Sequence, residues 1–364
     1  MKEKTGYLLL STGDVLEGKW LGSEQATEGE LVFNTSMTGY QEVMTDPSYA
    51  GQIITMTYPL IGNYGFNHVD NESIKPFLNG LVIAHPSHHP DHYQLRDTLE
   101  EMAIKHGIPV LYDIDTRAVT RIIRKNGEVY GKITSDKQDF PTKLAVARDI
   151  VNNVSVQRIT PLKANSNYAG SSNCHVVLWD FGYKQSITRT LKSLGCDVTV
   201  VPYDTPSGTI KELHPDAVIL SNGPGDPESL SHLAGNIKTI AECYPVLGIC
   251  LGHQLIASAY GAATKRLPYG HRGSNHPVRN TAQGKVMITS QNHGYVVDDE
   301  TIDKTIWDIS YININDASIE GLKHRQKPVV TVQFHPEAHP GPSDAHTIFE
   351  EFFSTILKRE AQYA

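Results

Sequence analysis

PVLGICLGHQ, at residues 245–254, decides the fold of the second half of this chain. An apolar run ends at Gly248, and Cys250 then precedes Leu251 and a second glycine, Gly252. Glycines two positions away on each side of a cysteine indicate a sharp strand-to-helix turn, because side chains there would clash with the crowded strand and helix. The pattern predicts a cysteine held out of a sheet at the start of a helix.

This placement suits Cys250 to act as a nucleophile. The thiolate is the reactive form of cysteine, and backbone N–H groups and the dipole at a helix N-terminus favour that anion. The alternative is a buried core cysteine in an ordinary strand–helix turn. Cys174, Cys196 and Cys243 lack the G-x-C-x-G setting, and we expect them to be core or surface thiols.

Apolar strands alternate with helices on both sides of this turn. Strands are predicted at 175–182, 197–201 and 216–225, and helices at 184–195, 207–213, 228–242 and 251–260. This alternation is typical of a mostly parallel sheet covered by helices on both faces. Such sheets bind ligands beyond the carboxyl ends of their strands, so the turn at Cys250 lies where a site is expected.

The stretch VVTVQFHPEA, at 329–338, supplies a base and a group to orient it. An apolar strand ends at His335, and Glu337 follows two residues later. Residues i and i+2 of an extended chain point the same way, so the carboxylate can reach the imidazole. A nucleophile needs such a base, and the base needs an orienting partner. A structural histidine at a strand end is the alternative.

The turn LSNGPGDP, at 220–227, follows another predicted strand. Its residues Gly223, Pro224 and Gly225 present backbone groups that no large side chain obstructs. Two N–H groups near the sulfur would form an oxyanion hole, worth several kcal/mol in acyl transfer, roughly 3 for one donor. An ordinary tight turn is the alternative interpretation of this segment.

The first 150 residues follow a different pattern. Strand segments surround turns in YLLLSTGDVLEGKWLG and QIITMTYPLIGNYG, and helices are predicted near 93–106 and 116–125. Asn, Ser, Gly and Pro enrich 160–173, as in linkers. The sequence therefore predicts a mixed α/β domain at 1–150, a linker at 151–172 and a second α/β domain at 173–364.

GICLGHQ, SNGPGDP and QFHPEA, in this order and spacing, resemble the class I (triad) glutamine amidotransferases. The resemblance covers roughly 173–364. It implies that Cys250 attacks the side-chain amide of glutamine, giving a γ-glutamyl thioester and releasing ammonia. It further implies that His335 transfers protons and that Glu337 orients the imidazole. The N–H groups of Leu251 and Gly223 would stabilise the oxyanion.

Other segments resemble the small chains of carbamoyl-phosphate synthases, so that this likeness runs nearly end to end. They are FNTSMTGYQEVMTDPSYAGQIITMTYPLIGNYG (33–65), DIDTRAVTR (113–121), GHRGSNHPV (270–278) and SQNHGYVV (290–297). By this resemblance glutamine is held by Ser48, Gly223, Gly225, Leu251, Gln254, Asn292, Gly294 and Tyr295. Tyr295 stands where many members have phenylalanine, and a contact through its backbone would make that change matter little. Hydrogen-bonding groups of this kind suit the zwitterionic glutamine and reject analogues that leave them unpaired.

The chain contains no G-x-x-x-x-G-K-[ST] motif and so no phosphate cradle of that type. The resemblance places ATP and Mg²⁺ on a separate large subunit, which would pair with this chain as a heterodimer and receive its ammonia through an internal tunnel. The N-terminal domain is the expected contact surface. No cofactor or metal is expected in this chain. Histidines do cluster in a Pro-containing stretch that we expect to be a solvated loop, at His85, His88, His89 and His92.

Composition excludes several classes of partner. The chain has 364 residues, 39% hydrophobic and 20% charged, with a net charge of −8. That balance argues against nucleic acid and anionic membranes. No apolar run approaches the roughly 18 residues of a membrane span, and four cysteines without CxxC spacing suit a reducing, cytoplasmic compartment.

The sequence leaves three other functions open. The chain could serve another amidotransferase-fed synthase, act as a non-catalytic regulatory scaffold, or be a stand-alone γ-glutamyl thiol hydrolase. The N-terminal domain disfavours the first and the third, and an intact Cys, His and Glu set disfavours the second. His253 is expected to pack, and the role of His293 is left open. Carbamoyl phosphate feeds arginine and pyrimidine synthesis, and VVPYDT and HPEAHPGPSD favour the arginine branch.

Overall fold

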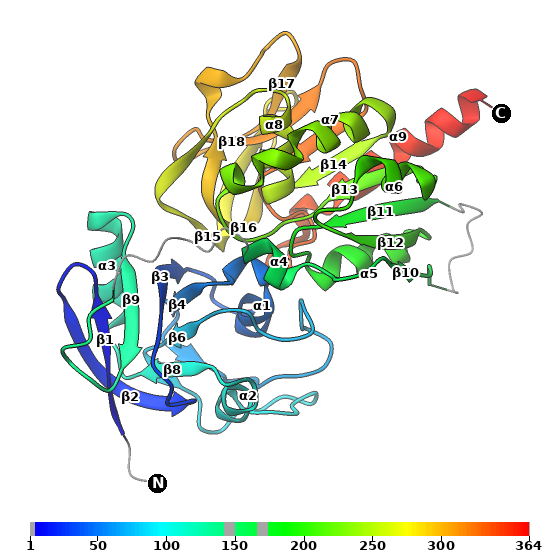
Figure 1. Cartoon of the computed structure of the whole chain (residues 1–364). Helices are drawn as coiled ribbons and strands as arrows, with labels where there is room; N and C mark the ends of the chain where they lie inside the picture. The colour runs from blue at the N-terminus through cyan, green and yellow to red at the C-terminus, as the bar shows by residue number, and fades with distance from the viewer. Residues whose placement is uncertain (1–3, 142–149, 166–173, 364) are drawn as a thin grey trace. The chain divides into compact units, whose positions relative to one another are not determined.

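The computed structural model describes residues 4–141, 150–165 and 174–363 (Figure 1). The chain forms two compact units. The first comprises Met1–Arg148 with Leu267–Gly273, and the second comprises Asp149–Arg266 with Ser274–Ala364. Across the described residues, no helix is both long enough and apolar enough to cross a membrane.

The first unit is built around a closed barrel with strand order β1-β2-β8-β6-β4-β3-β9. The barrel strands are β1 (Thr5–Leu10), β2 (Val15–Gly22), β3 (Thr27–Asn34), β4 (Gln52–Met56), β6 (Gly80–Val82), β8 (Pro109–Tyr112) and β9 (Tyr130–Thr134). Parallel pairs join β3, β4, β6 and β8, and the remaining pairs are antiparallel. A separate small pair comprises β5 (Leu60–Ile61) and β7 (His85–Pro86). The unit also contains α1 (Tyr40–Thr45), η1 (Pro47–Tyr49), α2 (Leu99–His106) and α3 (Thr116–Asn126).

Strand alternation divides the apolar side chains of this unit between two clusters. Ile53 joins the cluster that contains Val119 of α3, and its neighbour Ile54 joins the cluster that contains Ala103 of α2. Successive strand residues point to opposite faces, so the side chains of the two faces belong to separate clusters. Thr98 and Glu101 form a capping box that begins α2 at Leu99, later than the predicted 93. Asp115 caps α3, which begins at the predicted residue 116.

The second unit contains a ten-stranded sheet with order β10-β12-β11-β13-β14-β19-β18-β17-β15-β16. Its strands are β10 (Thr160–Leu162), β11 (His175–Asp180), β12 (Asp197–Pro202), β13 (Ala217–Leu220), β14 (Val246–Ile249), β15 (Thr264–Asn280), β16 (Val286–Val297), β17 (Trp307–Asn313), β18 (Ile319–His324) and β19 (Val329–Val332). The central strands β12, β11, β13, β14 and β19 pair in parallel, as Figure 1 shows for β11 to β14. The pairs of β18 with β19 and with β17 are antiparallel.

Helices cover both faces of this sheet. They are α4 (Ile150–Val154), α5 (Gln185–Ser193), α6 (Ser207–Glu212), α7 (Ala234–Cys243), α8 (Leu251–Ala259) and α9 (Thr347–Tyr363), with short 3₁₀ segments η2 (Pro227–Leu233), η3 (Asp299–Thr301) and η4 (Ser343–Ala345). On one face Val177 packs in a cluster with Ile240 of α7, and on the other Leu178 packs in a cluster with Ile187 of α5. The predicted α/β fold, with a sheet between helices, is confirmed. The sheet is parallel only in its centre, because β10 at one edge and β18, β17 and β15 beyond β19 form antiparallel pairs.

The structure differs from the predicted linker at 151–172. Residues Ile150–Val154 form α4, with Val151 buried, and Thr160–Leu162 form β10 at the edge of the sheet beside β12. Pro161 suits such a strand because an edge position needs no donor on its outer side. Apolar side chains within a polar stretch thus anchor its first half, while 166–173 lies outside the described residues.

A second difference concerns Leu267–Gly273, which groups with the first unit although it lies inside the predicted second domain. Thr35 donates its backbone N–H to the carbonyl of Arg272 over 3.2 Å, and Arg272 is buried. The composition of this segment does not differ from that of its neighbours in the sequence. Its place in the first unit depends on contacts with residues far away along the chain, which sequence patterns do not show.

Candidate active site

The turn at Cys250 has the strained geometry that its flanking glycines predict. β14 ends at Ile249, α8 begins at Leu251, and Cys250 between them has φ 53° and ψ −105°. A positive φ is uncommon outside glycine and clusters at functional sites. The Cys250 N–H donates to the carbonyl of Val332 over 2.8 Å, and Sγ lies 3.6 Å from the carbonyl of Asn292. The surrounding strands therefore hold the sulfur in place.

Close packing explains why both glycines are needed. A Cβ on Gly248 would lie 2.6 Å from Cδ1 of Ile256 and 2.8 Å from the carbonyl oxygen of Gly252. A Cβ on Gly252 would meet the carbonyl of Leu220 and lie 2.8 Å from its Cβ. No real Cβ tolerates such distances, so the predicted reason for the G-x-C-x-G pattern is confirmed.

His335 and Glu337 follow β19 and are both buried. Nδ1 of His335 lies 2.6 Å from Oε1 of Glu337, and the His335 N–H donates to the carbonyl of Ser290 over 2.9 Å. Nε2 has no hydrogen-bond partner of standard geometry in the described part of the chain. The Cys250 side chain interacts with this imidazole, and Nε2 is the ring nitrogen left for it because Glu337 occupies Nδ1. The geometry is that of a thiol, a base and an orienting carboxylate.

Charges at this array favour a protonated imidazole beside an ionised carboxylate. Burial lowers the pKa of His335, but the charge of Glu337, the interaction with Cys250 and the hydrogen bond with Glu337 outweigh it and raise the pKa to about 10. Burial raises the pKa of Glu337, but the charges of Lys184 and His335 outweigh it and lower the pKa to about 2. The imidazolium therefore holds a proton that it can give to a leaving group.

Lys184 is a member of this array that the sequence analysis missed. Its Nζ lies 3.1 Å from Oε1 of Glu337 and donates to the carbonyl of Ala338. The side chain is buried, on the residue that precedes α5 and shortly follows the carboxyl end of β11. A lysine just beyond a buried parallel strand, in DFGYK, was the available signal, because the carboxyl ends of such strands meet at one edge of the sheet.

The glycine-rich turn after β13 lies against α8. A Cβ on Gly223 would meet the carbonyl of Phe181 and lie 2.9 Å from Cδ2 of Leu251. Gly225 has φ 94°, which side-chain-bearing residues rarely adopt. The Leu251 N–H is at the first position of α8, where N–H groups have no acceptor within the helix. The structure thus brings the two predicted oxyanion donors, Gly223 and Leu251, together.

Most of the predicted glutamine-binding residues also lie around Cys250. Nε2 of Gln254 donates to the carbonyl of Tyr295 over 2.7 Å and to Oε1 of Gln333 over 2.9 Å. Asn292, Gly294 and Tyr295 follow one another on β16. Gln254 therefore joins the nucleophile helix to that strand through the Tyr295 backbone, while the Tyr295 hydroxyl accepts from Nη1 of Arg266 over 3.2 Å.

Comparisons with known proteins find matches in both halves of the chain. The family model described as "Glutamine amidotransferase class-I" matches residues 177–355, and "Carbamoyl-phosphate synthase small chain, CPSase domain" matches residues 8–133. The carbamoyl phosphate synthase small chain of Staphylococcus saprophyticus is 46% identical over 97% of this chain and 96% of its own length. The chain belongs to the carbamoyl phosphate synthase small chain family.

Two further relatives in this family carry a more specific name. The carbamoyl phosphate synthase arginine-specific small chain of Halalkalibacterium halodurans is 45% identical over 98% of this chain and 99% of its own length. That of Bacillus subtilis is 46% identical over 99% of each chain. The similarity therefore spans this small chain from end to end.

One residue predicted to hold glutamine lies in the first unit of this small chain. Ser48 is on η1 and is buried, and its N–H donates to Oδ1 of Asp46, the residue that caps the segment, over 2.9 Å. Its contact with glutamine stays a prediction, because the Cys250 array belongs to the second unit.

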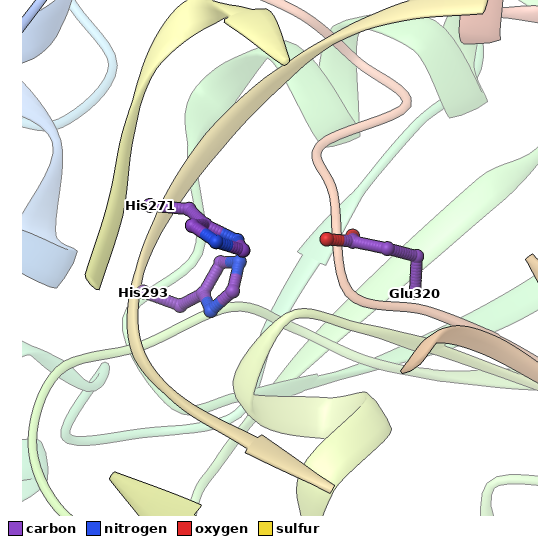
Figure 2. Close-up of side chains that lie close together, drawn as sticks. All are labelled: His271, His293 and Glu320. Carbon is purple, nitrogen blue, oxygen red and sulfur yellow. The ribbon is translucent and has the colours of Figure 1, made fainter. Parts of the chain in front are cut away.

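Two histidines near the array have roles other than the base. Nδ1 of His253 lies 2.7 Å from Oγ1 of Thr331, and burial lowers the pKa of His253 to about 3, so it packs as a neutral ring. His293 bonds through Nδ1 to the carbonyl of Tyr295 and through Nε2 to Oε1 of Gln291, each over 2.8 Å. Figure 2 shows His293 on β16, with the carboxylate of Glu320 on β18 turned toward that strand. Both ring nitrogens of His293 therefore bond to neighbouring residues of the same strand, β16.

Proposed function

We propose that this chain is the glutamine-hydrolysing small subunit of a carbamoyl-phosphate synthase. The observation that carries the proposal is the buried array of Cys250, His335 and Glu337 beyond a parallel sheet. It occurs in a chain that matches carbamoyl phosphate synthase small chains over nearly their whole length. An intact array favours catalysis over a scaffold, and the match at 8–133 favours this synthase over another amidotransferase-fed enzyme.

The proposed reaction has two halves. Sγ of Cys250 attacks the side-chain carbonyl carbon of glutamine, and the oxyanion accepts hydrogen bonds from the Leu251 and Gly223 N–H groups. The C–N bond then breaks as His335 protonates the leaving nitrogen, giving ammonia and a γ-glutamyl thioester. Neutral His335 next takes a proton from water as the water oxygen attacks the thioester carbon. The C–S bond then breaks, which gives glutamate and restores the Cys250 thiolate beside the His335 imidazolium.

The raised pKa of His335 fits the first half of this reaction. An imidazolium is the acid that the leaving ammonia requires, and the thiolate is the nucleophile. Glu337 stabilises that cation and orients the ring through Nδ1, so that Nε2 faces the sulfur and the substrate. Gln254, Asn292, Gly294, Tyr295, Gly225 and Ser48 would position the glutamine.

The partner in this proposal is the large subunit of the synthase. The relatives are called small chains, which supports pairing with a larger one. The large subunit would bind ATP and Mg²⁺, take up the ammonia through an internal tunnel, and use bicarbonate to make carbamoyl phosphate. This chain would supply ammonia within a heterodimer and need no cofactor of its own.

We further propose an arginine-dedicated, cytoplasmic enzyme. Two of the three relatives described above are named arginine-specific, whereas the staphylococcal one carries no pathway name. Pyrimidine synthesis would be the other use of the product. A reducing compartment supports a reactive thiol, and none of the four cysteines, all in described segments, forms a disulfide.

Glutamine hydrolysis tests the proposal. The purified chain is assayed for glutamate and ammonia, alone and with the large subunit, ATP and bicarbonate. The expected result is weak activity alone that rises sharply with the partner. Strong activity that ignores the partner would instead identify a γ-glutamyl thiol hydrolase, and no activity under either condition would identify a scaffold.

A further inference from the structure

Helix α3 of the first unit exposes a row of cations. Its eleven residues, TRAVTRIIRKN, include Arg117, Arg121, Arg124 and Lys125 and no carboxylate. All four side chains are exposed, whereas Val119 on the opposite side is buried against the barrel strands. The chain as a whole carries a net charge of −8, so this helix is opposite in sign to the rest of the protein.

These four cations differ from most of the described lysines elsewhere in the same unit. Lys19 lies 3.3 Å from Asp113, Lys132 lies 2.6 Å from Asp139, and Lys4 and Lys137 pair with glutamates. None of the four cations of α3 forms an ion pair with a carboxylate inside the described ranges. Like charges this close on one helix repel one another unless an outside anion compensates them.

A groove of about 600 Å³ runs beside this row. Its lining comes from α3 and from one residue of the segment that groups with the first unit, and comprises Ala118, Arg121, Ile122, Arg124, Lys125 and Tyr269. Tyr269 is 39% exposed, and the Arg124 guanidinium lies 5.8 Å from its ring centroid. Ala118 and Ile122 add apolar surface. Tyrosine and arginine around an apolar patch are typical of the centre of a protein–protein interface.

The spacing of the cations points to an extended partner. Arg117 and Arg124 are seven residues apart, which spans about 10 Å along a helix. A single phosphate or carboxylate cannot contact both ends of such a row, whereas an acidic peptide segment can. The net charge of the chain disfavours nucleic acid, because long-range repulsion would oppose its approach.

We propose that α3 and Tyr269 form the docking site for an acidic segment of the large synthase subunit. Hereafter the exposed side chains of Arg117, Arg121, Arg124, Lys125 and Tyr269 are called the α3 basic surface. The proposal rests on the proposed function, since that function requires such a partner. It assigns the partner contact to the barrel unit, which contains none of the residues of the Cys250 array.

The test is the double variant Arg121→Glu/Arg124→Glu, titrated with the purified large subunit. Both side chains are exposed and form no ion pair within the described residues, so reversal leaves folding intact, which circular dichroism and the melting temperature check. We expect binding to weaken at least about tenfold, because attraction becomes repulsion at the interface. Glutamine hydrolysis by the variant alone stays at the wild-type rate, and its stimulation by the large subunit falls.

Two matched variants separate a local contact from net charge. Lys4→Glu/Lys137→Glu makes the same change in net charge on the same unit, away from α3, and should bind within about twofold of wild type. Arg121→Lys/Arg124→Lys keeps the charges. Its affinity for the large subunit should fall only about threefold, because lysine lacks the planar fork with which arginine binds a carboxylate. Raising the salt concentration should weaken wild-type binding more steeply than binding of the Glu double variant.

Three outcomes would overturn the assignment. One is unchanged large-subunit binding in Arg121→Glu/Arg124→Glu; another is an equal loss in the Lys4→Glu/Lys137→Glu control. The third is self-association that disappears in the Arg→Glu variant while large-subunit binding persists, which would make a second copy the occupant. If the proposed function itself were wrong, the result would be different: the wild-type chain would neither bind the large subunit nor respond to it.

Discussion

Nζ of Lys184 lies 3.1 Å from Oε1 of Glu337, and both side chains are buried. Oε1 of Glu337 also accepts from Nδ1 of His335, so one carboxylate oxygen connects two cations. Two positive groups flank one negative group here, out of contact with water. The arrangement is stable because each buried charge has a partner, and it makes Lys184 the residue that fixes the charge of Glu337.

Lys184→Met should impair catalysis and folding together. Loss of the ammonium removes a cause of the low pKa of Glu337 and leaves a buried carboxylate with one partner, at a cost of about 3 kcal/mol. We expect kcat to fall more than KM changes, since Lys184 orients the array and glutamine contacts other residues. Chemical denaturation and steady-state kinetics measure both effects.

A double-mutant cycle with Glu337→Gln separates this role from simple packing. If Lys184 acts through Glu337, the second substitution adds little to kcat loss once the first is present. Additive losses in the double variant would show that the two residues act independently.

Cys250→Ser should abolish glutamine hydrolysis while leaving the folded chain able to bind its partner. A serine hydroxyl is not ionised by this histidine, so no thioester analogue forms at a useful rate. Synthesis of carbamoyl phosphate from free ammonia should persist with the large subunit present. Cys243→Ser is the matched control, since Cys243 is a free, exposed thiol outside the array, and it should retain full activity. Equal loss of the ammonia-driven reaction in Cys250→Ser would contradict the division of labour.

His335 and Glu337 give opposite pH dependences of stability. Because the pKa of His335 is raised on folding, protonated His335 stabilises the folded chain. This contribution to the free energy of unfolding is complete below the unfolded-state pKa of 6.5 and is lost as pH rises toward about 10. The lowered pKa of Glu337 means that its contribution is present above 4.5 and is lost as pH falls toward about 2. The free energy of unfolding of wild type should therefore decline from pH 6.5 to 10 more than that of His335→Gln. Parallel curves for the two proteins over that range would refute the raised pKa.

Gly252→Ala should disrupt the nucleophile turn. The new Cβ would meet the Leu220 carbonyl, so β13 and α8 must separate, at a cost of about 1–3 kcal/mol. Activity should fall more than tenfold, roughly, because a small misplacement of the sulfur lowers the rate steeply. Gly235→Ala is the matched control, since Gly235 lies in α7 with open space around it. Its free energy of unfolding should rise by about 0.5 kcal/mol, because alanine favours a helix more than glycine does. Normal activity in Gly252→Ala would show that the turn tolerates a side chain.

Local signals explain which features could be predicted from the sequence. Periodicity and glycine spacing are short-range properties, so the helix after Cys250, the strand before His335 and the α/β class were accessible. Lys184 was not, because its meaning arises from a contact with Glu337 across more than 150 residues of chain. The same limit applies to Leu267–Gly273, which joins the first unit only through long-range bonds.

The predicted linker fails for a related reason. Asn, Ser and Gly dominate its composition, yet Val151 and the short β10 strand find partners in the second unit. A few apolar residues in a polar stretch carry little weight in a sequence average, although burial of each one contributes about 1.5 kcal/mol or more. The closed order of the barrel strands was likewise hidden, since it joins strands far apart in the sequence, such as β2 with β8 and β3 with β9.

Tyr295→Phe should change glutamine kinetics only slightly. The backbone carbonyl of Tyr295, which Gln254 and His293 both contact, is unaffected by the substitution. The hydroxyl loses its bond with Arg266, a half-exposed contact worth roughly 1 kcal/mol, so KM should rise by no more than about fivefold at constant kcat. Gln254→Ala, which removes the donor to that carbonyl, should raise KM far more. A larger effect from Tyr295→Phe than from Gln254→Ala would show that the side chain, and not the backbone, positions the glutamine.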